Sequence, residues 1–203
     1  MTNKSDKQKL HDHIIAAANG DEISWRFIVD SYANRVFALI RSKCANEDLA
    51  EEITQSTFCT VAQKLQDYTE TGKFEAWLFR IAMNRMRDEM RRRKRHAVPM
   101  ENEMIGVLSS GISDVQEDDE VAIEIQRLRA AIRQLSSSDQ DIIHMRHSAV
   151  MSYKQIAEAL GEPLGTVLAR QHRALKKLRG YMDCDGNLQK SSNKGAINEG
   201  DNR

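Results

Sequence analysis

The sequence predicts an all-α protein composed of two small helical domains joined by a flexible acidic linker. Apolar residues recur at steps of three and four in both halves of the 203-residue chain, which is the spacing of amphipathic helices. This periodicity disappears between residues 97 and 119, where glycine, serine and acidic residues accumulate. Only two prolines occur, and no long segment alternates polar and apolar residues. We therefore expect domains at 1–96 and 120–182, with the linker at 97–119 between them.

The first domain is predicted to be a helical bundle with three apolar stripes. Asn46 is a candidate N-cap because the acids Glu47 and Asp48 follow it, where the helix dipole favours negative charge. A turn-like segment at 69–73 precedes the third stripe, and the helix that carries it becomes basic toward its end. Its last turns are therefore expected to leave the core and face an anionic partner. The stripes are Trp25, Ile28, Tyr32, Val36 and Ile40; Leu49, Ile53, Val61 and Leu65; and Phe74, Trp77, Leu78, Ile81 and Ala82.

The second domain is predicted to end in a helix-turn-helix. A serine-rich segment at 135–141 caps a short helix, and Ser152 and Gln155 fit the capping box of the next one. Gly161 is suited to end that helix in a left-handed conformation, and a basic helix follows after a short turn. The segment 183–203 is polar, so we expect a disordered tail. The first stripe of this domain is Val121, Ile125, Leu128, Ile132 and Leu135, and the basic helix carries Val167, Leu175 and Leu178.

The charges are distributed in opposed blocks, although 30 Lys and Arg balance 30 Asp and Glu overall. The segment 80–95 contains eight basic residues and two acids, and the segment 166–179 contains five basic residues and no acid. The segment 101–124 contains acids but no Lys or Arg, and it largely coincides with the predicted linker. The two basic blocks are therefore the candidate surfaces for an anionic partner.

Several other classes of protein are not favoured. No apolar run is long enough for a membrane span and the N-terminal residues lack the features of a secretory signal, so we expect a cytoplasmic protein without membrane insertion. Histidine pairs at 11 and 13 and at 144 and 147 lack a third ligand. We expect no metal, no cofactor and no catalytic residue, and hence not an enzyme. Reduced thiols are expected for Cys44, Cys59 and Cys184, which follow no zinc or disulfide spacing.

The basic helix that ends the second domain is a candidate DNA-recognition helix. The second helix of a helix-turn-helix enters the major groove, where its N-terminal residues meet base edges. Arginine can read a guanine edge with two hydrogen bonds, whereas lysine beside a phosphate adds affinity without sequence information. A solvated basic face is the alternative interpretation. The groove candidates are Thr166, Leu168, Ala169, Arg170, His172 and Arg173, and the backbone candidates are Lys176, Lys177 and Arg179.

Aromatic and polar residues precede and join the basic block at 80–95. An unstacked base needs a ring to stack on and a cation that follows the backbone, and this segment offers both. The alternative is an arginine run that only keeps the bundle soluble, with Phe74 and Trp77 in the core. The candidate residues beside the charge are Tyr68, Lys73, Phe74, Trp77 and Asn84.

Three motifs carry a resemblance to a known family. EDLAEEITQSTF at 47–58 and KFEAWLFRIAMNRMRDEMRRRKR at 73–95 resemble region 2 of the sigma-70 family, and SYKQIAEALGEPLGTVLARQHRALKKL at 152–178 resembles its region 4. The compact extracytoplasmic-function branch keeps only these two regions. Ser56 and Thr57 depart from the Glu and Val that are common in region 2. Leu168 and Ala169 replace the usual basic and hydroxyl residues, so the common −35 sequence of the family is not assumed here.

The resemblance implies an alternative sigma factor, with a region 2 bundle and a region 4 helix-turn-helix, that binds core RNA polymerase and directs promoter-specific initiation of transcription. The implied partners are the β′ clamp and β subunit of the polymerase, promoter DNA and an anti-sigma factor. Docking on the polymerase would involve Asp48, Glu51, Glu52 and Gln55. The −10 non-template strand would contact Tyr68, Lys73, Phe74, Trp77, Asn84, Arg87, Arg91 and Arg92. The −35 duplex would contact Thr166, Leu168, Ala169, Arg170, His172, Arg173, Lys176 and Lys177.

Two other functions are kept as alternatives. A helix-turn-helix repressor or activator that acts without polymerase would use 1–96 to sense a signal or to dimerise, and it would bind a palindromic duplex tightly by itself. A helical adaptor whose basic faces meet acidic proteins would support no transcription with core polymerase. The recognition-helix pattern at 152–178 opposes the adaptor.

Overall fold

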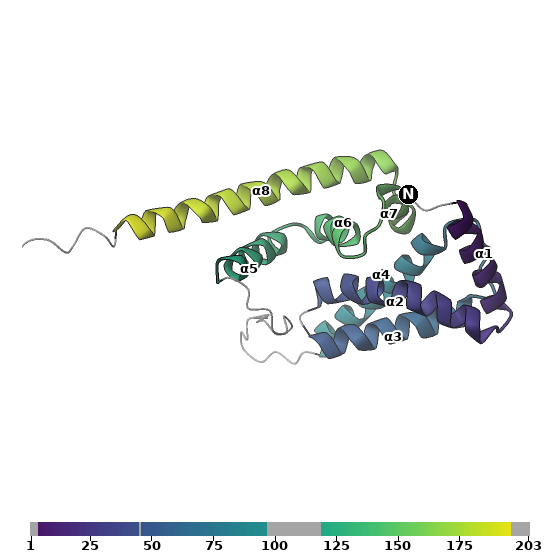
Figure 1. The fold of residues 1–203 in the computed structure, drawn as a ribbon. Coiled ribbons are helices and arrows are strands. Elements are labelled where there is room, and N and C mark those ends of the chain that lie inside the picture. Colours follow the sequence, from purple (N-terminus) through teal and green to yellow (C-terminus); the bar gives the residue numbers. More distant parts are fainter. Residues whose placement is uncertain (1–3, 45, 97–118, 196–203) are drawn as a thin grey trace, which may run out of the picture. The chain divides into compact units, whose positions relative to one another are not determined.

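The computed structural model describes residues 4–44, 46–96 and 119–195, and these residues form helices and connecting turns without any strand (Figure 1). The predicted all-α class is confirmed. The predicted linker lies outside the described residues except for Asp119. The helices are α1 (Lys4–Ala18), α2 (Glu22–Lys43), α3 (Glu47–Lys64), α4 (Phe74–His96), α5 (Asp119–Arg133), α6 (Ser137–His147), α7 (Tyr153–Leu160) and α8 (Leu164–Gly195).

The chain divides into two compact units. The first comprises Met1–Gly111 and His144–Leu164, and the second comprises Ile112–Ile143 and Gly165–Arg203. Among the described residues the first unit holds α1 to α4 and also α7, which contacts α4. The boundaries predicted from the sequence place the segment 144–164 in the second domain instead. The second unit holds α5, most of α6 and nearly all of α8.

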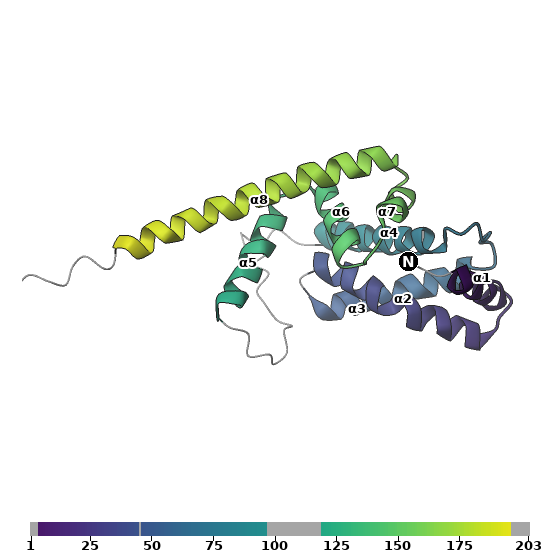
Figure 2. The same ribbon diagram turned by 45° about the horizontal axis from the view of Figure 1, so that its top comes forward.

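The core of the first unit lies between α2, α3 and α4, which run side by side, while α1 packs on α2 (Figure 2). The starts of α2 and α3 are capped. The Asp21 side chain accepts from the Ser24 N–H at 2.8 Å, and the Asn46 side chain accepts from the Leu49 N–H at 2.8 Å. The predicted cap at Asn46 is thus confirmed. Large side chains that are at most 2% exposed here are Ile28, Leu39, Ile40, Leu65, Phe74, Leu78, Phe79 and Met83.

The fourth helix leaves the core as its sequence predicts. Its buried residues extend from Phe74 to Met86, whereas Met90 is 36% exposed and 91–95 are all exposed. The apolar pattern stops after Met86 and arginines replace it, so the last two turns have no side chains with which to continue the bundle. The basic end of α4 therefore stands at the surface of the first unit.

The second unit has a smaller core around the inner face of α8. Leu135, Ile143 and Ala174 are buried together, and Ile132, Leu178 and Tyr181 pack against them. The predicted stripe on α5 is only half realised, because Val121 is 49% exposed and Leu128 is 39% exposed. Burial on α5 begins at Ala131, next to the α6 connection. The apolar periodicity located this helix but did not show where its packing starts.

The backbone of the predicted helix-turn-helix matches the sequence signals. Ser152 and Gln155 form a reciprocal capping box at the start of α7, and Gly161 ends this helix with φ of 70°. Residues 161–163 form the turn, and α8 begins at Leu164. The segment after residue 183 differs from the predicted disordered tail, because α8 continues to Gly195. Extending an existing helix requires no new nucleation, so polar composition alone does not end it at residue 183.

The turn between α6 and α7 contains a residue in an unfavourable backbone conformation. Val150 has φ of 55° and a side chain that is 67% exposed. A β-branched residue in the left-handed region clashes with its own backbone, whereas glycine does not. We expect Val150→Gly to raise the free energy of unfolding by about 0.5–1 kcal/mol in urea denaturation, after the greater unfolded-state entropy of glycine has offset part of the gain. Val150→Ala should gain less, and equal stability of all three chains would contradict the strain.

Candidate polymerase and nucleic-acid interfaces

The acidic candidates for polymerase docking share one exposed face of α3. Asp48, Glu51, Glu52 and Gln55 are all exposed, while Leu49, Ile53 and Thr54 between them are buried. This separation follows from helical spacing, since residues three and four apart lie on the same face. The Asn46 cap fixes where the helix begins and hence which face carries the acids. The four predicted residues therefore form one continuous polar surface, which we call the acidic face.

Three aromatic rings gather where α4 begins. The ring centroids of Tyr68 and Trp77 are 4.5 Å apart, and Phe74 lies 5.7 Å from each of them. Tyr68 and Trp77 are half-buried, whereas Phe74 is 2% exposed and also contacts Tyr32 at 5.8 Å. The three aromatic candidates from the sequence therefore lie in contact with one another. Phe74, however, presents no ring surface to a ligand and supports the other two from the core side.

The segment that connects α3 to α4 holds these rings in a tight turn. Gly72 has φ of 76°, which favours glycine, and the Gly72 N–H donates to a carboxylate oxygen of Glu70. Burial, together with the negative charge of Glu70, raises the pKa of the Tyr68 phenol further above physiological pH, at which a phenol is already neutral. Lys73 is exposed beside this turn. A neutral half-buried ring, a second ring and a cation thus lie together.

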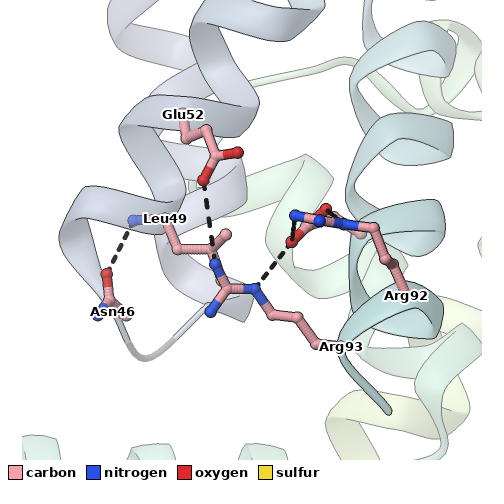
Figure 3. A network of polar contacts seen from close by, with 6 residues as sticks. Asn46, Leu49, Glu52, Arg92 and Arg93 are labelled. Carbon is pink, nitrogen blue, oxygen red and sulfur yellow. Dashed lines mark hydrogen bonds and ion pairs between the residues drawn. The ribbon is translucent and has the colours of Figure 1, made fainter. Parts of the chain in front are cut away.

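Several arginines at the basic end of α4 have polar partners on the same helix, and those of Arg91, Arg92 and Arg93 are acids. A guanidinium nitrogen of Arg87 lies 3.4 Å from the Asn84 side-chain oxygen, and one of Arg91 lies 3.7 Å from Asp88. Arg92 binds Glu89 with two parallel hydrogen bonds of 2.7 and 2.8 Å (Figure 3). The basic block is exposed as predicted, but neighbouring acids moderate its charge.

Sequence reasoning missed the role of Glu89 and the link from α4 to the acidic face. Arg93 donates to Glu89 at 2.8 Å and also lies 3.9 Å from a carboxylate oxygen of Glu52 (Figure 3). The spacing of Glu89 to Arg92 and Arg93, three and four residues, was a readable signal in the sequence. The contact with Glu52 required the packing of α3 on α4. Two surfaces that were predicted separately therefore meet at Arg93.

The recognition-helix candidates lie on the outward face of α8. Thr166, Leu168, Ala169, His172, Arg173, Lys176 and Lys177 are exposed, and Arg170 is half-buried. The opposite side is formed by Val167, Gln171 and Ala174, all at most 4% exposed. Lys177 lies 3.3 Å from a carboxylate oxygen of Asp139, so one of the predicted phosphate contacts already has an acidic neighbour. Leu168 is 44% exposed and offers an apolar surface among these polar candidates.

Two classes of site are not found in the described part of the chain. No cluster of three or more His, Cys, Asp or Glu side chains that could hold a metal ion occurs among those residues. No described helix has the length and apolar character that crossing a bilayer requires. Of the cysteines, Cys44 is buried with a pKa raised by that burial, and Cys59 is exposed.

The described residues are helical and carry an exposed acidic face, an aromatic and basic surface, and a helix-turn-helix. Residues 28–96 match Sigma-70 region 2, and residues 131–180 match Sigma-70 region 4. The chain therefore belongs to the sigma-70 family, in its extracytoplasmic-function group. It is a sigma factor, that is, a protein that binds RNA polymerase and directs the initiation of transcription.

Curated relatives carry the same family name. The chain is 32% identical over 171 residues to the ECF RNA polymerase sigma factor SigE of Mycolicibacterium smegmatis, a match that covers 81% of this chain and 65% of SigE. The chain thus spans slightly less than two thirds of that relative. It is 29% identical over 167 residues to SigW of Bacillus subtilis, with 79% and 89% of the two chains covered.

Solved structures with a similar fold come from the same group of proteins. CnrH, in complex with the cytosolic domain of CnrY, superimposes with a TM-score of 0.64 at 23% identity and covers 85% of this chain and 96% of its own. The sigma factor RpoE of Bartonella quintana, in complex with the anti-sigma factor NepR, gives a TM-score of 0.61 at 24% identity, with 79% and 97% covered. At 23% and 24% identity, these similarities show a shared fold alone.

Proposed function

We propose that this sigma factor docks on the β′ clamp of core RNA polymerase through the acidic face of α3. The supporting observation is that Asp48, Glu51, Glu52 and Gln55 are exposed together on one side of a capped helix. Charged residues at such a surface steer association and set the register of the partners more than they add affinity. The β subunit is the proposed second contact on the polymerase.

The −10 element is proposed to be held at the start of α4. A base extruded from the non-template strand would stack on Tyr68 or Trp77, while Lys73, Asn84 and the arginines at 87, 91 and 92 follow the backbone. Phe74 has a different role in this proposal: it is buried and holds the two partly exposed rings in place. Strand opening is then driven by capture of a base, without a catalytic residue or cofactor of this chain.

The −35 element is proposed to be read by the first turns of α8. Arg170 and Arg173 would pair with guanine edges, whereas Lys176 and Lys177 would contact phosphates. Thr166 and His172 supply polar contacts beside them. Leu168 and Ala169 can contact only apolar groups, such as the methyl group of thymine. The observation that carries this proposal is the division of α8 into an exposed face with these residues and a buried face with Val167 and Ala174.

The arrangement along the chain fits this division of labour. We propose region 2 at 1–96, a linker at 97–119, region 4 at 120–182 and a C-terminal tail from 183. Polymerase would fix the spacing of two cationic surfaces, each too small to hold DNA tightly alone, and this raises their joint affinity. The place of action is the cytoplasm, where polymerase meets the chromosome. An anti-sigma factor is the proposed negative regulator.

Run-off transcription with purified core polymerase tests this function. A library of genomic promoter fragments is transcribed with and without the chain, and the start sites are mapped. We expect new start sites that share a −35 and a −10 sequence and that depend on the chain. A library without any such start site would overturn the proposal.

The second domain should bind duplex DNA with a strong salt dependence. If α8 contacts about five phosphates, log affinity falls against log salt concentration with a slope of roughly −4 to −5, at about −0.9 per phosphate. If Lys177 keeps its contact with Asp139, about four phosphates are contacted and the slope should be the shallower one, near −4. Fluorescence anisotropy of a −35 duplex at several salt concentrations measures the slope, and a slope near zero is incompatible with cationic DNA binding.

A further inference from the structure

Glu89 stands out because it is an acid inside the basic end of α4 that holds two arginines at once. Arg92 donates to it from Nε and from one Nη, at 2.7 and 2.8 Å, and Arg93 Nε adds a third hydrogen bond of 2.8 Å. These bonds lower the pKa of Glu89 to about 2, so the carboxylate stays charged at physiological pH. The Glu89 side chain is only 14% exposed, whereas those of Arg92 and Arg93 are 55% and 50% exposed.

The direction in which these arginines point follows from the position of Glu89 on the helix. Glu89 lies three residues after the buried Met86 and seven after the buried Ala82, so it continues the face that packs on the bundle. It therefore holds the guanidinium of Arg93 toward α3, where Glu52 lies 3.9 Å away (Figure 3). The neighbouring pair of Arg91 and Asp88 differs: it is 3.7 Å long, and its side chains are 75% and 67% exposed.

A carboxylate and a phosphate compete for the same guanidinium. Both accept two parallel hydrogen bonds from an arginine fork, and both carry the charge that makes these bonds strong. A nucleic-acid phosphate must therefore displace Glu89 before it can bind the Nε side of Arg92 or Arg93, where Glu89 now accepts. Arg91, in a longer and more exposed pair, exchanges its partner more easily.

We propose that Glu89 is an internal competitor of the nucleic-acid backbone, which restrains the arginines at 92 and 93 and thereby limits the affinity of region 2 for single-stranded DNA. The inference rests on the proposed −10 surface and adds a residue that sets its strength. Weak binding by the free chain leaves promoter choice to the polymerase-bound state. Because Arg93 also meets Glu52, docking of Glu52 on the polymerase removes one of the two acids that hold this arginine.

The test measures binding of the full-length chain to a fluorescent oligo(dT) of 20 nucleotides at several salt concentrations. Glu89→Gln is expected to tighten binding between about three- and tenfold at 50 mM salt and to steepen the salt slope by about 1.4, if two phosphates gain contact at about 0.7 each. Glu89→Asp keeps the net charge but shortens the side chain, so it should produce a smaller gain in the same direction.

Two controls separate this restraint from a general change of charge. Asp30→Asn removes one exposed acid from α2 and should tighten binding much less than Glu89→Gln. In an Arg92→Gln, Arg93→Gln background, Glu89→Gln should produce no gain, because the arginines that it would release are absent. Circular dichroism melts confirm that each variant is folded.

The inference is wrong if Glu89→Gln binds no tighter than Asp30→Asn, or if its gain persists without the two arginines. Run-off transcription by the unaltered chain is measured alongside. Active transcription together with an unchanged oligo(dT) affinity of Glu89→Gln would overturn this inference alone. Absence of transcription would overturn the proposed function itself.

Discussion

Joint replacement of Arg170 and Arg173 by alanine is expected to reduce transcription from a −35-dependent promoter on the order of 100-fold or more, because each bidentate contact with a guanine edge contributes about 1–3 kcal/mol. Both residues lie in the first turns of α8, where a recognition helix meets bases. Arg173 is exposed and Arg170 is half-buried, so neither substitution opens a cavity in the core. Binding of the chain to core polymerase should be unchanged.

A matched variant on the same helix distinguishes base reading from charge. Arg179→Ala removes the same side chain from an exposed position further along α8, where only phosphate contact is expected. It should weaken all promoters about equally, whereas the double variant should also relax discrimination between −35 sequences. Unimpaired transcription by the Arg170, Arg173 variant from its own promoter would show that this helix does not read the −35 element.

Charge reversal on the acidic face is expected to weaken binding to core polymerase on the order of 100-fold, since a like charge at a docking surface costs several kcal/mol. Glu52→Lys is one such variant. Because Glu52 lies 3.9 Å from Arg93, this replacement also places two positively charged side chains next to each other. Glu51→Lys reverses an adjacent exposed charge on the same face without that complication. Both variants should bind core polymerase more weakly while they keep their affinity for an isolated −35 duplex.

Asp30→Lys provides the control, because it makes the same reversal at an exposed position of α2 outside the acidic face. Titration of the fluorescently labelled unaltered chain and of each variant with core polymerase measures these affinities. Equal polymerase affinity for Glu51→Lys, Asp30→Lys and the unaltered chain would show that the acidic face does not dock on the polymerase. Thermal melts are needed for Glu52→Lys in particular, to separate lost docking from the repulsion of Arg93.

Local signals predicted the elements of the fold well because they act within a few residues. The caps at Asn46 and Ser152 and the left-handed Gly161 are set by side-chain and backbone chemistry that a short stretch of sequence contains in full. The separation of exposed from buried residues on α3 and α8 follows from helical periodicity in the same way.

Properties that depend on packing were less predictable. Periodicity placed Phe74 on the same stripe as Trp77, but only the packing of α4 against its neighbours buries the first and leaves the second half-exposed. The contact of Arg93 with Glu52 joins residues 41 positions apart, which no local pattern specifies. Likewise, composition could not indicate that α8 continues past residue 183 to Gly195, because helix extension depends on the turns before it.

The affinity of the chain for cognate promoter DNA, measured with and without core polymerase, tests the central claim most directly. We expect the chain alone to bind DNA weakly and without sequence preference, and to bind its own promoter tightly once the polymerase is present. A stable dimer that binds a palindromic duplex tightly, with an affinity that core polymerase leaves unchanged, would contradict it.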